Sequence, residues 1–215
     1  MKQMMISALS AAAMLLASAH AERQPEAEAF IVAVVDELKS AADEHGDTSA
    51  EVRQVLEDNL ATDAIGRFLL AGDAANSATE EQRARYDTLF PRFIAAAFAE
   101  EIGQLTSRRI DVTGSLERRP GDIIVQSSLF DSSDVKRASI DWRVRVLETG
   151  ENKLLDVLVE RISPLITRRQ TFSSIVDEEG VEGLLAFMET TIGEAGVASL
   201  ETPIVSDEAV AGGAE

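Results

Sequence analysis

The feature that most constrains this chain is a change in the spacing of its apolar residues. Between Ile110 and Ile162 the apolar side chains alternate along the sequence, as they do in half-buried β-strands. On both sides of this stretch they recur every three or four residues, which is typical of amphipathic helices. The turn signals Pro120-Gly121-Asp122 and Gly150 separate strands within the alternating part. Helices, a four-stranded meander and further helices, in that order, predict an α+β fold with an antiparallel sheet.

The predicted helices have recognisable starts. Thr48 with Glu51 and Thr79 with Gln82 form capping boxes, and the second of these opens the longest periodic stretch. After the strands, Ser163-Pro164 is typical of an N-cap followed by the first helical residue. A final helix is expected after Gly180. The apolar stripe of the longest helix consists of Tyr86, Leu89, Phe90, Phe93, Ile94, Ala97 and Phe98.

The last strand, KLLDVLVERI at residues 153–162, has too few polar positions for a strand with one wet face. Alternation places Leu155, Val157 and Val159 on one face. The other face then holds Leu154, Leu158 and Ile162, and Asp156 and Glu160 are its only charged residues. Two explanations are open from the residues alone: flanking helices cover both faces, or one face lines an apolar cavity.

The ends of the chain differ in composition from its middle. Residues 1–21 combine one lysine, a short apolar run and Ala19-His20-Ala21, which is the layout of a cleavable secretory signal peptide. We expect a single domain over residues 22–200 and a disordered acidic tail over residues 201–215. The sequence has no cysteine for a disulfide or a lipid anchor, so we expect an exported, soluble protein, most simply in a bacterial periplasm.

The charge and the residue types exclude several functions. A formal net charge of −18 opposes binding to nucleic acid and to anionic bilayers, so contact with membranes is expected only through docking proteins. With no cysteine and one histidine beyond the signal peptide, His45, neither a zinc site nor Cys/His catalysis is expected. The chain has no nucleophile-elbow pattern and no glycine-rich phosphate loop. We therefore expect neither an enzyme nor a metal or cofactor.

Four basic pairs stand out in this acidic chain: Arg108-Arg109, Arg118-Arg119, Lys136-Arg137 and Arg168-Arg169. Local charge balance at the ends of strands and helices is one explanation for them. An anion site is the other, because guanidinium groups suit the geometry of phosphate. Arg168-Arg169 is the best candidate, since it follows the doubly apolar strand in the helix that begins at Pro164.

Three stretches together resemble the MlaC-like family of periplasmic phospholipid carriers, also called toluene-tolerance proteins. SATEEQRARYDTLFPRFIAAAF, from Ser77 to Phe98, is similar to the family's A-T-x-x-Q-R helix, and LLDVLVERIS resembles its apolar strand. RRQTFSSIVDEEGVEGLL, from Arg168 to Leu185, is similar to the family's Y-R-S-Q-F segment and the E-G-[IV]-x-G-L that follows. The resemblance covers roughly Ala27 to Ile192. The chain departs from the family pattern at Arg161 (usually glycine), Asn152 (tryptophan), Arg168 and Phe98 (tyrosine), and Ala75 (often aromatic).

The resemblance implies a fold and a function. The fold is a four-stranded antiparallel sheet clasped by helices around an apolar cavity that holds phospholipid acyl chains. The function is a monomeric periplasmic carrier that maintains the lipid asymmetry of the outer membrane. Its implied partners are an outer-membrane lipoprotein–porin complex and an inner-membrane ABC transporter with a substrate-binding ring. Two other classes stay open: a small-molecule-binding protein or enzyme on an NTF2-like cone, and a ligand-free periplasmic adaptor with a filled core.

The expected site has an apolar wall and a cationic mouth. The candidate wall residues are Phe90, Phe93, Phe98, Trp142, Val144, Leu155, Val157, Val159 and Phe172. Arg168 and Arg169 are the candidates for the lipid headgroup, because an arginine at the mouth forms charge-assisted hydrogen bonds with phosphate. Arg169 stands at the matching arginine of the resembling family.

Overall fold

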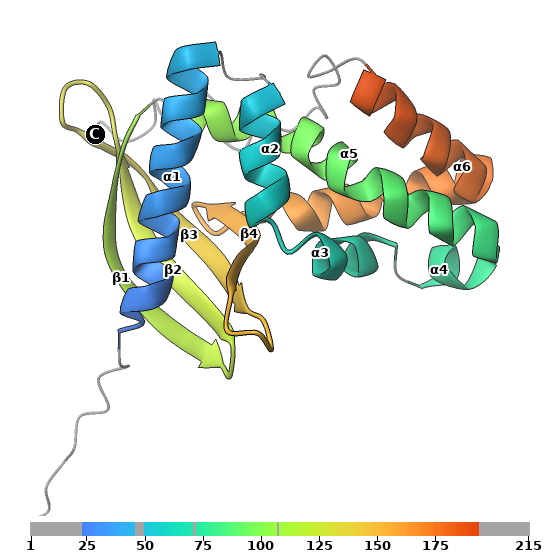
Figure 1. Ribbon diagram of the computed structural model, residues 1–215, viewed down its shortest axis with the longest axis horizontal. Helices are drawn as coiled ribbons and strands as arrows, with labels where there is room; N and C mark the ends of the chain where they lie inside the picture. Colours follow the sequence, from blue (N-terminus) through green and yellow to red (C-terminus); the bar gives the residue numbers. More distant parts are fainter. Residues whose placement is uncertain (1–22, 46–49, 71, 107, 194–215) are drawn as a thin grey trace, which may run out of the picture.

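The computed structural model describes residues 23–45, 50–70, 72–106 and 108–193 (Figure 1). Helices come first, a four-stranded sheet follows, and one long helix ends the described chain, as the periodicity predicts. The elements are α1 (Pro25–His45), α2 (Ala50–Asn59), α3 (Thr62–Leu69), α4 (Asp73–Ser77), α5 (Glu80–Thr106), β1 (Arg109–Arg119), β2 (Asp122–Phe130), β3 (Lys136–Val146), β4 (Asn152–Val159) and α6 (Pro164–Gly193).

The sheet is a simple meander. Its strands lie in the order β1-β2-β3-β4, and every neighbouring pair is antiparallel. Gly121 and Gly150 both have positive φ, which glycine adopts without a steric penalty, and they turn the chain between β1 and β2 and between β3 and β4. The predicted α+β class and the antiparallel sheet are confirmed.

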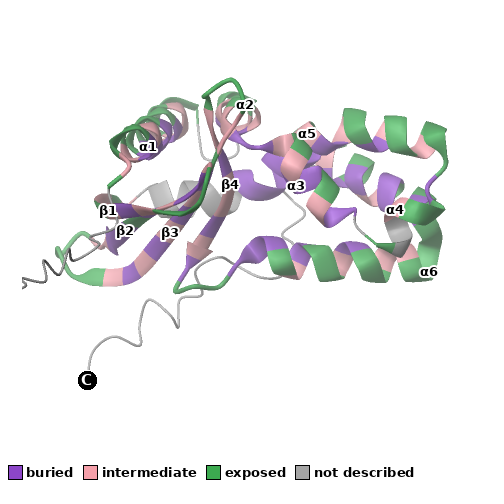
Figure 2. Ribbon diagram, turned by 90° about the horizontal axis from the view of Figure 1, so that it is seen from below, coloured by how far each residue is buried: buried purple, intermediate pink, exposed green. Residues whose placement is uncertain are grey.

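Helices α1 and α2 lie across one face of the sheet, while α3 to α6 form a helical part beside its β4 edge (Figures 1 and 2). The apolar stripe of α1 is buried on the sheet, with Ile31, Val34 and Leu38 at most 2% exposed. The edge of β4 is covered at the start of α3, where the Ala61 amide donates to the Leu154 carbonyl at 2.8 Å. This pairing protects the edge strand from water.

The helical part is built around a row of aromatic rings. Tyr86 stacks on Phe90, and Phe93 packs against both Phe172 and Phe187 of α6 with ring centroids 5.5 and 5.8 Å apart. Helix α3 approaches α5 closely at Gly66, where an added Cβ atom would lie 3.1 Å from the Phe90 ring. The predicted apolar stripe of α5 is therefore the face that joins the helices.

Several local predictions are confirmed. The Thr79–Gln82 capping box is formed, since the Thr79 amide donates to Gln82 Oε1 at 3.0 Å and the Gln82 amide donates to Thr79 Oγ1 at 3.2 Å. Ser163 caps α6 through the Ile166 amide at 3.3 Å. Gly180 interrupts α6 with a φ of 71°, which separates the two predicted helices by a kink.

One boundary was predicted wrongly, because β4 ends at Val159 and does not extend to Ile162. Glu160 and Arg161 have positive φ values of 48° and 68°, so the chain reverses there in a two-residue turn. Ile162 then pairs back with Val159 through hydrogen bonds of 2.9 and 3.2 Å. The resembling family has glycine at the position of Arg161, and the positive φ explains why glycine suits it.

The predicted signal peptide, the acidic tail and the Thr48 capping box lie outside the described residues. Within the described ranges, no helix combines the length and the apolar character needed to cross a membrane.

Candidate functional site

The apolar face of the sheet is the centre of the candidate site. Ile140, Trp142 and Val144 alternate along β3 and are fully buried, and they pair in register with Val159, Val157 and Leu154 of β4. The Trp142 indole donates from Nε1 to Ser127 Oγ at 2.8 Å, and the Ser127 hydroxyl donates to the Ile140 carbonyl at 3.3 Å. Ser127 and the Trp142 indole thus satisfy each other, which leaves the β3 and β4 part of this face apolar toward the helices.

A β-bulge in β4 changes which leucine belongs to this face. Val144 pairs with Leu154 and Arg143 pairs with Asp156, so Leu155 is an extra residue opposite a single step of β3. Leu154 is 1% exposed and lies in the core, while Leu155 lines a surface pocket of about 430 Å³ together with Leu60 and Arg145. The prediction that Leu155 shares the buried face with Val157 and Val159 is wrong, and Leu154 takes that place.

The other predicted wall residues come together in one cluster. Helix α5 supplies Phe90, Phe93 and Phe98, β3 supplies Trp142 and Val144, β4 supplies Val157 and Val159, and α6 supplies Phe172, all of them buried in the same hydrophobic core. Leu155 is partly buried and packs against the edge of that core. Residues distant in the sequence therefore form one continuous apolar region between the sheet and the helices.

Two residues join this region that the sequence reasoning left out. Leu154 was assigned to the opposite face, because period-two alternation takes no account of a bulge. Phe187 of α6 contacts Phe93 and is partly buried against the core. It lies between the core residues Leu184 and Met188, so its aromatic character was the signal that was available in the sequence.

The two candidate headgroup arginines have different surroundings. Arg168 is 4% exposed, its guanidinium lies 4.0 Å from the centre of the Phe98 ring, and its Nη2 donates to the Ala97 carbonyl at 3.3 Å. Arg169 is exposed and lies over the ring of Phe68 at 4.7 Å. Among the described residues Arg169 makes no ion pair with Asp156 or Glu160. Arg168 is thus next to the apolar region, and Arg169 is on the protein surface.

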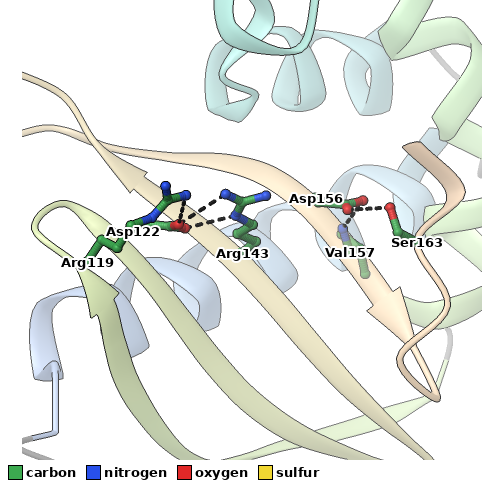
Figure 3. A network of polar contacts seen from close by, with 6 residues as sticks. All are labelled: Arg119, Asp122, Arg143, Asp156, Val157 and Ser163. Atoms are coloured by element: carbon green, nitrogen blue, oxygen red, sulfur yellow. Dashed lines mark hydrogen bonds and ion pairs between the residues drawn. The ribbon is translucent and has the colours of Figure 1, made fainter. Parts of the chain in front are cut away.

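The opposite face of the sheet is polar and has a buried ion pair beside the turn between β1 and β2 (Figure 3). Arg143 donates to both carboxylate oxygens of Asp122, from Nε at 2.8 Å and from Nη2 at 3.0 Å, and Arg119 donates to the same carboxylate at 3.0 Å. The hydrogen bond from Arg143 holds the pKa of Asp122 below its usual range. This carboxylate is fully engaged, so it offers no free charge to a ligand.

Asp156 is another carboxylate of the polar face, and it links β4 to α6. Its carboxylate accepts hydrogen bonds from Ser163 Oγ at 2.6 Å and from the Val157 amide at 3.0 Å (Figure 3). Burial raises the pKa of Asp156, and these hydrogen bonds oppose the rise. Because Ser163 also caps α6, Asp156 fixes the start of the helix that carries Arg168 and Arg169.

A cluster of titratable groups suited to catalysis would need a base, an acid or a nucleophile held free of such pairing. Tyr86 is buried, and its hydroxyl donates to the Gly66 carbonyl at 3.0 Å. Burial raises the pKa of Tyr86, so this phenol stays protonated as a structural donor. Within the described ranges, no three His, Cys, Asp or Glu side chains are grouped as a metal site requires.

The geometry defines an α+β protein in which helices enclose one apolar face of an antiparallel meander. Comparison with known proteins gives the family: the chain belongs to the MlaC family (MlaC protein), which it matches over residues 27–190. Its fold is also similar to the crystal structure of a phospholipid-binding protein from Ralstonia solanacearum in complex with a phospholipid. The TM-score is 0.61 at 17% sequence identity, over 79% of this chain and 98% of that one. No curated protein matches the chain in sequence.

Proposed function

We propose that this protein is a periplasmic phospholipid carrier that holds acyl chains between the apolar face of its sheet and the aromatic faces of α5 and α6. The observation that carries the proposal is the match to the MlaC family over almost all of the described chain, from residue 27 to residue 190. The similar fold of the Ralstonia protein, whose structure contains a phospholipid, supports it. Family and fold thus favour a binding or transport protein over an enzyme.

The energetics of acyl-chain burial suit this function. Each buried methylene contributes about 0.8 kcal/mol, so one acyl chain of about fourteen methylenes contributes at most about 11 kcal/mol before ordering costs. A carrier has to supply that burial while it moves lipid through water. The proposed wall consists of Phe90, Phe93, Phe98, Trp142, Val144, Val157, Val159 and Phe172, with Leu154 in place of Leu155.

Release of the lipid requires a second protein, since a ligand leaves a favourable site only for a better one or after the site changes shape. We propose the two assemblies that the family resemblance implies: an outer-membrane lipoprotein–porin complex and the substrate-binding ring of an inner-membrane ABC transporter. Shuttling between them would maintain the lipid asymmetry of the outer membrane. Residues 1–21 act as the export signal in this proposal, residues 22–200 as the single carrier domain, and residues 201–215 as an acidic tail.

The decisive experiment is lipid extraction from the purified mature protein, followed by mass spectrometry. We expect co-purified phospholipid in a fixed ratio to protein. A folded protein that carries no lipid, and takes none up from vesicles, would contradict the carrier function.

The wall is tested by filling it with a larger side chain. Val157→Trp should displace lipid with little loss of stability if Val157 lines a cavity that opens for lipid. In a permanently packed core the same change should cost about 1–3 kcal/mol through overpacking. Lipid content by mass spectrometry and unfolding in urea, measured on the same preparation, separate the two outcomes.

The headgroup is proposed to lie at Arg168 and Arg169, at the start of α6. Arg169→Glu should weaken lipid retention without loss of folded structure, because Arg169 is exposed and makes no ion pair with the carboxylates described around it. Arg118→Glu changes another exposed arginine and serves as the matched control. Equal lipid retention in the two variants would refute the assignment of Arg169 to the headgroup.

A further inference from the structure

The geometry points to a docking surface for an acidic partner protein at the β4–α6 tip, which we define as Arg161, Ile162 and Ile166. This inference rests on the proposed carrier function, because a carrier must contact a donor and an acceptor of lipid. The tip follows β4 directly and precedes the pair Arg168-Arg169 on α6. It is therefore beside the proposed headgroup position, where lipid would pass to a partner.

The first observation is apolar exposure. Ile162 is 66% exposed and Ile166 is 56% exposed, the highest values among the large apolar residues of the described chain. They lie on either side of the N-cap Ser163, and Ile166 is in the first turn of α6. The other two exposed large apolar residues, Val32 on α1 and Val135 between β2 and β3, stand far apart in the sequence and singly. Two exposed isoleucines within five residues of one another mark a contact surface more specifically than single exposed valines do.

The second observation is a strained backbone that holds the tip in place. Glu160 and Arg161 are consecutive non-glycine residues with positive φ, a conformation that side chains with a Cβ atom rarely adopt. The turn is nevertheless fixed from both sides. The Ser139 amide donates to Glu160 Oε1 at 2.5 Å, and the Glu160 amide donates to the Ser139 carbonyl at 3.0 Å. Strain that the surrounding structure enforces is a feature of functional sites, and here the strained turn carries the exposed residue Arg161.

The third observation is charge. Arg161 is exposed and forms no ion pair within the described ranges, and residues 160–169 carry three arginines against the single carboxylate of Glu160. Arg169, in the second turn of α6, adds a second exposed guanidinium. The tip is thus a positive corner on a chain of formal net charge −18. Such a corner orients the chain toward a negatively charged surface and speeds the encounter.

The size and charge of the tip decide between occupants. A second copy of this chain would bring together two cationic tips and two chains of formal net charge −18, which like charges oppose. An anionic bilayer would attract the tip and repel the rest of the acidic chain. A protein with an apolar socket ringed by carboxylates satisfies both the isoleucines and the arginine. Two isoleucines and one arginine make a small contact, which suits a carrier that has to dissociate after each transfer.

The experiment measures binding of the full mature protein to two immobilised probes by biolayer interferometry. The probes are the purified substrate-binding ring and the purified lipoprotein–porin complex in detergent, from the same organism. The double variant Ile162→Ser/Ile166→Ser should lose at least tenfold in affinity for at least one probe. Arg161→Glu should slow association with an acidic probe and weaken or invert the fall of the association rate with added salt. The control Val32→Ser/Val135→Ser, which changes two apolar residues of 47% and 46% exposure, should bind within twofold of the unmodified protein.

Unchanged affinity of the double variant for both probes would overturn the proposal, and so would a complete lack of binding by the unmodified protein. Binding to protein-free vesicles of phosphatidylglycerol and phosphatidylethanolamine that the double variant abolishes would also overturn it, because the tip would then contact membranes. If the double variant loses its helical circular dichroism, Ile166→Ser alone replaces it. Lipid content is measured on every variant. Lipid-free unmodified protein would refute the carrier function, whereas equal lipid content with lost docking supports the tip.

Discussion

The two faces of the same sheet are built from alternate residues of the same strands, yet they are stabilised in opposite ways. On one face Trp142, Val144 and Val157 are buried against helices, and the indole is bound by a single serine. On the other face Asp122 is as deeply buried, but it is surrounded by Arg143 and Arg119. The first face depends on the removal of apolar surface from water, and the second on the pairing of charges.

The difference bears on where a lipid is accommodated. Apolar packing is not directional, so acyl chains are able to replace side-chain contacts on the apolar face without leaving a polar group unsatisfied. The polar face has no such freedom, because displacement of Arg143 would leave the buried carboxylate of Asp122 without its two-point partner. The comparison therefore favours the apolar face as the lipid-binding surface and the polar face as the rigid support behind it.

The largest expected effect comes from the apolar face. Trp142→Ala should lower the free energy of unfolding by about 3–5 kcal/mol, because it removes a fully buried ring and leaves Ser127 without its donor. Urea unfolding followed by circular dichroism measures the loss. Trp142→Phe keeps most of the volume and should cost much less. A loss below 1 kcal/mol for Trp142→Ala would mean that this face is not tightly packed and would break the comparison.

The polar face should respond less strongly. Asp122→Ala should cost about 2–3 kcal/mol, below the usual range for a broken buried pair, because Arg143 is 28% exposed and water partly replaces its partner. Arg119→Ala is the matched control, since that arginine is 70% exposed and should contribute less than about 1 kcal/mol. Equal losses for the two variants would show that the pairing with Arg143 contributes nothing specific.

The sequence predicted the two faces better than it predicted the points where the strands deviate from regular geometry. Alternation correctly placed Trp142 and Val144 inside, and the Ser163-Pro164 pattern correctly located the start of α6. The bulge at Leu155 was not predictable, because an extra residue in one strand is defined only by its register with the neighbouring strand. The link from Asp156 to Ser163 was also missed, since it forms only after the chain has reversed.

The reversal after β4 was missed for a different reason. Turns with two positive φ values normally contain asparagine or glycine, and Glu160-Arg161 contains neither. The backbone preferences of glutamate and arginine oppose this turn, and the hydrogen bonds around it hold the chain in that conformation. Of the candidate site, the sequence therefore identified most of the apolar residues, and it could not identify the tip.

Asp122 and Asp156, the two carboxylates of the polar face in Figure 3, change the stability of the fold with pH in opposite directions. The lowered pKa of Asp122 contributes stability that is present above the unfolded pKa of about 3.9 and is lost as the pH falls through the folded pKa. For Asp156 the sign is opposite, because a raised folded pKa means that the folded state binds the proton more tightly. Stability from this group falls as the pH rises from the unfolded pKa to the folded pKa.

Asp156→Asn should therefore raise stability at pH 7 by on the order of 1 kcal/mol or less, because the amide oxygen keeps the hydrogen bond from the Val157 amide and the amide NH2 donates to Ser163 Oγ in place of the bond that Ser163 donated. The gain should disappear near pH 3, where Asp156 is protonated in both states. Thermal unfolding from pH 3 to pH 8 measures both limits. A variant less stable than the unmodified protein at pH 7 would show that the charge of Asp156, through Arg143 and Arg168, outweighs the cost of its burial.

The smallest expected effect concerns Arg161, which lies in the turn that follows β4. Arg161 has a φ of 68°, which costs a residue with a Cβ atom about 1–2 kcal/mol. Glycine avoids that cost but gains freedom in the unfolded chain, so Arg161→Gly should stabilise the fold by about 0.5–1 kcal/mol. Urea unfolding with replicate titrations resolves a change of this size. Glu151→Gly, at an exposed residue without positive φ, is the control and should not stabilise.

If Arg161→Gly is more stable and also binds the partner probes less tightly, arginine is retained here for docking at the expense of stability. If it is less stable, the turn at Glu160-Arg161 is not strained, and only the exposed isoleucines and the positive charge then support docking at the tip.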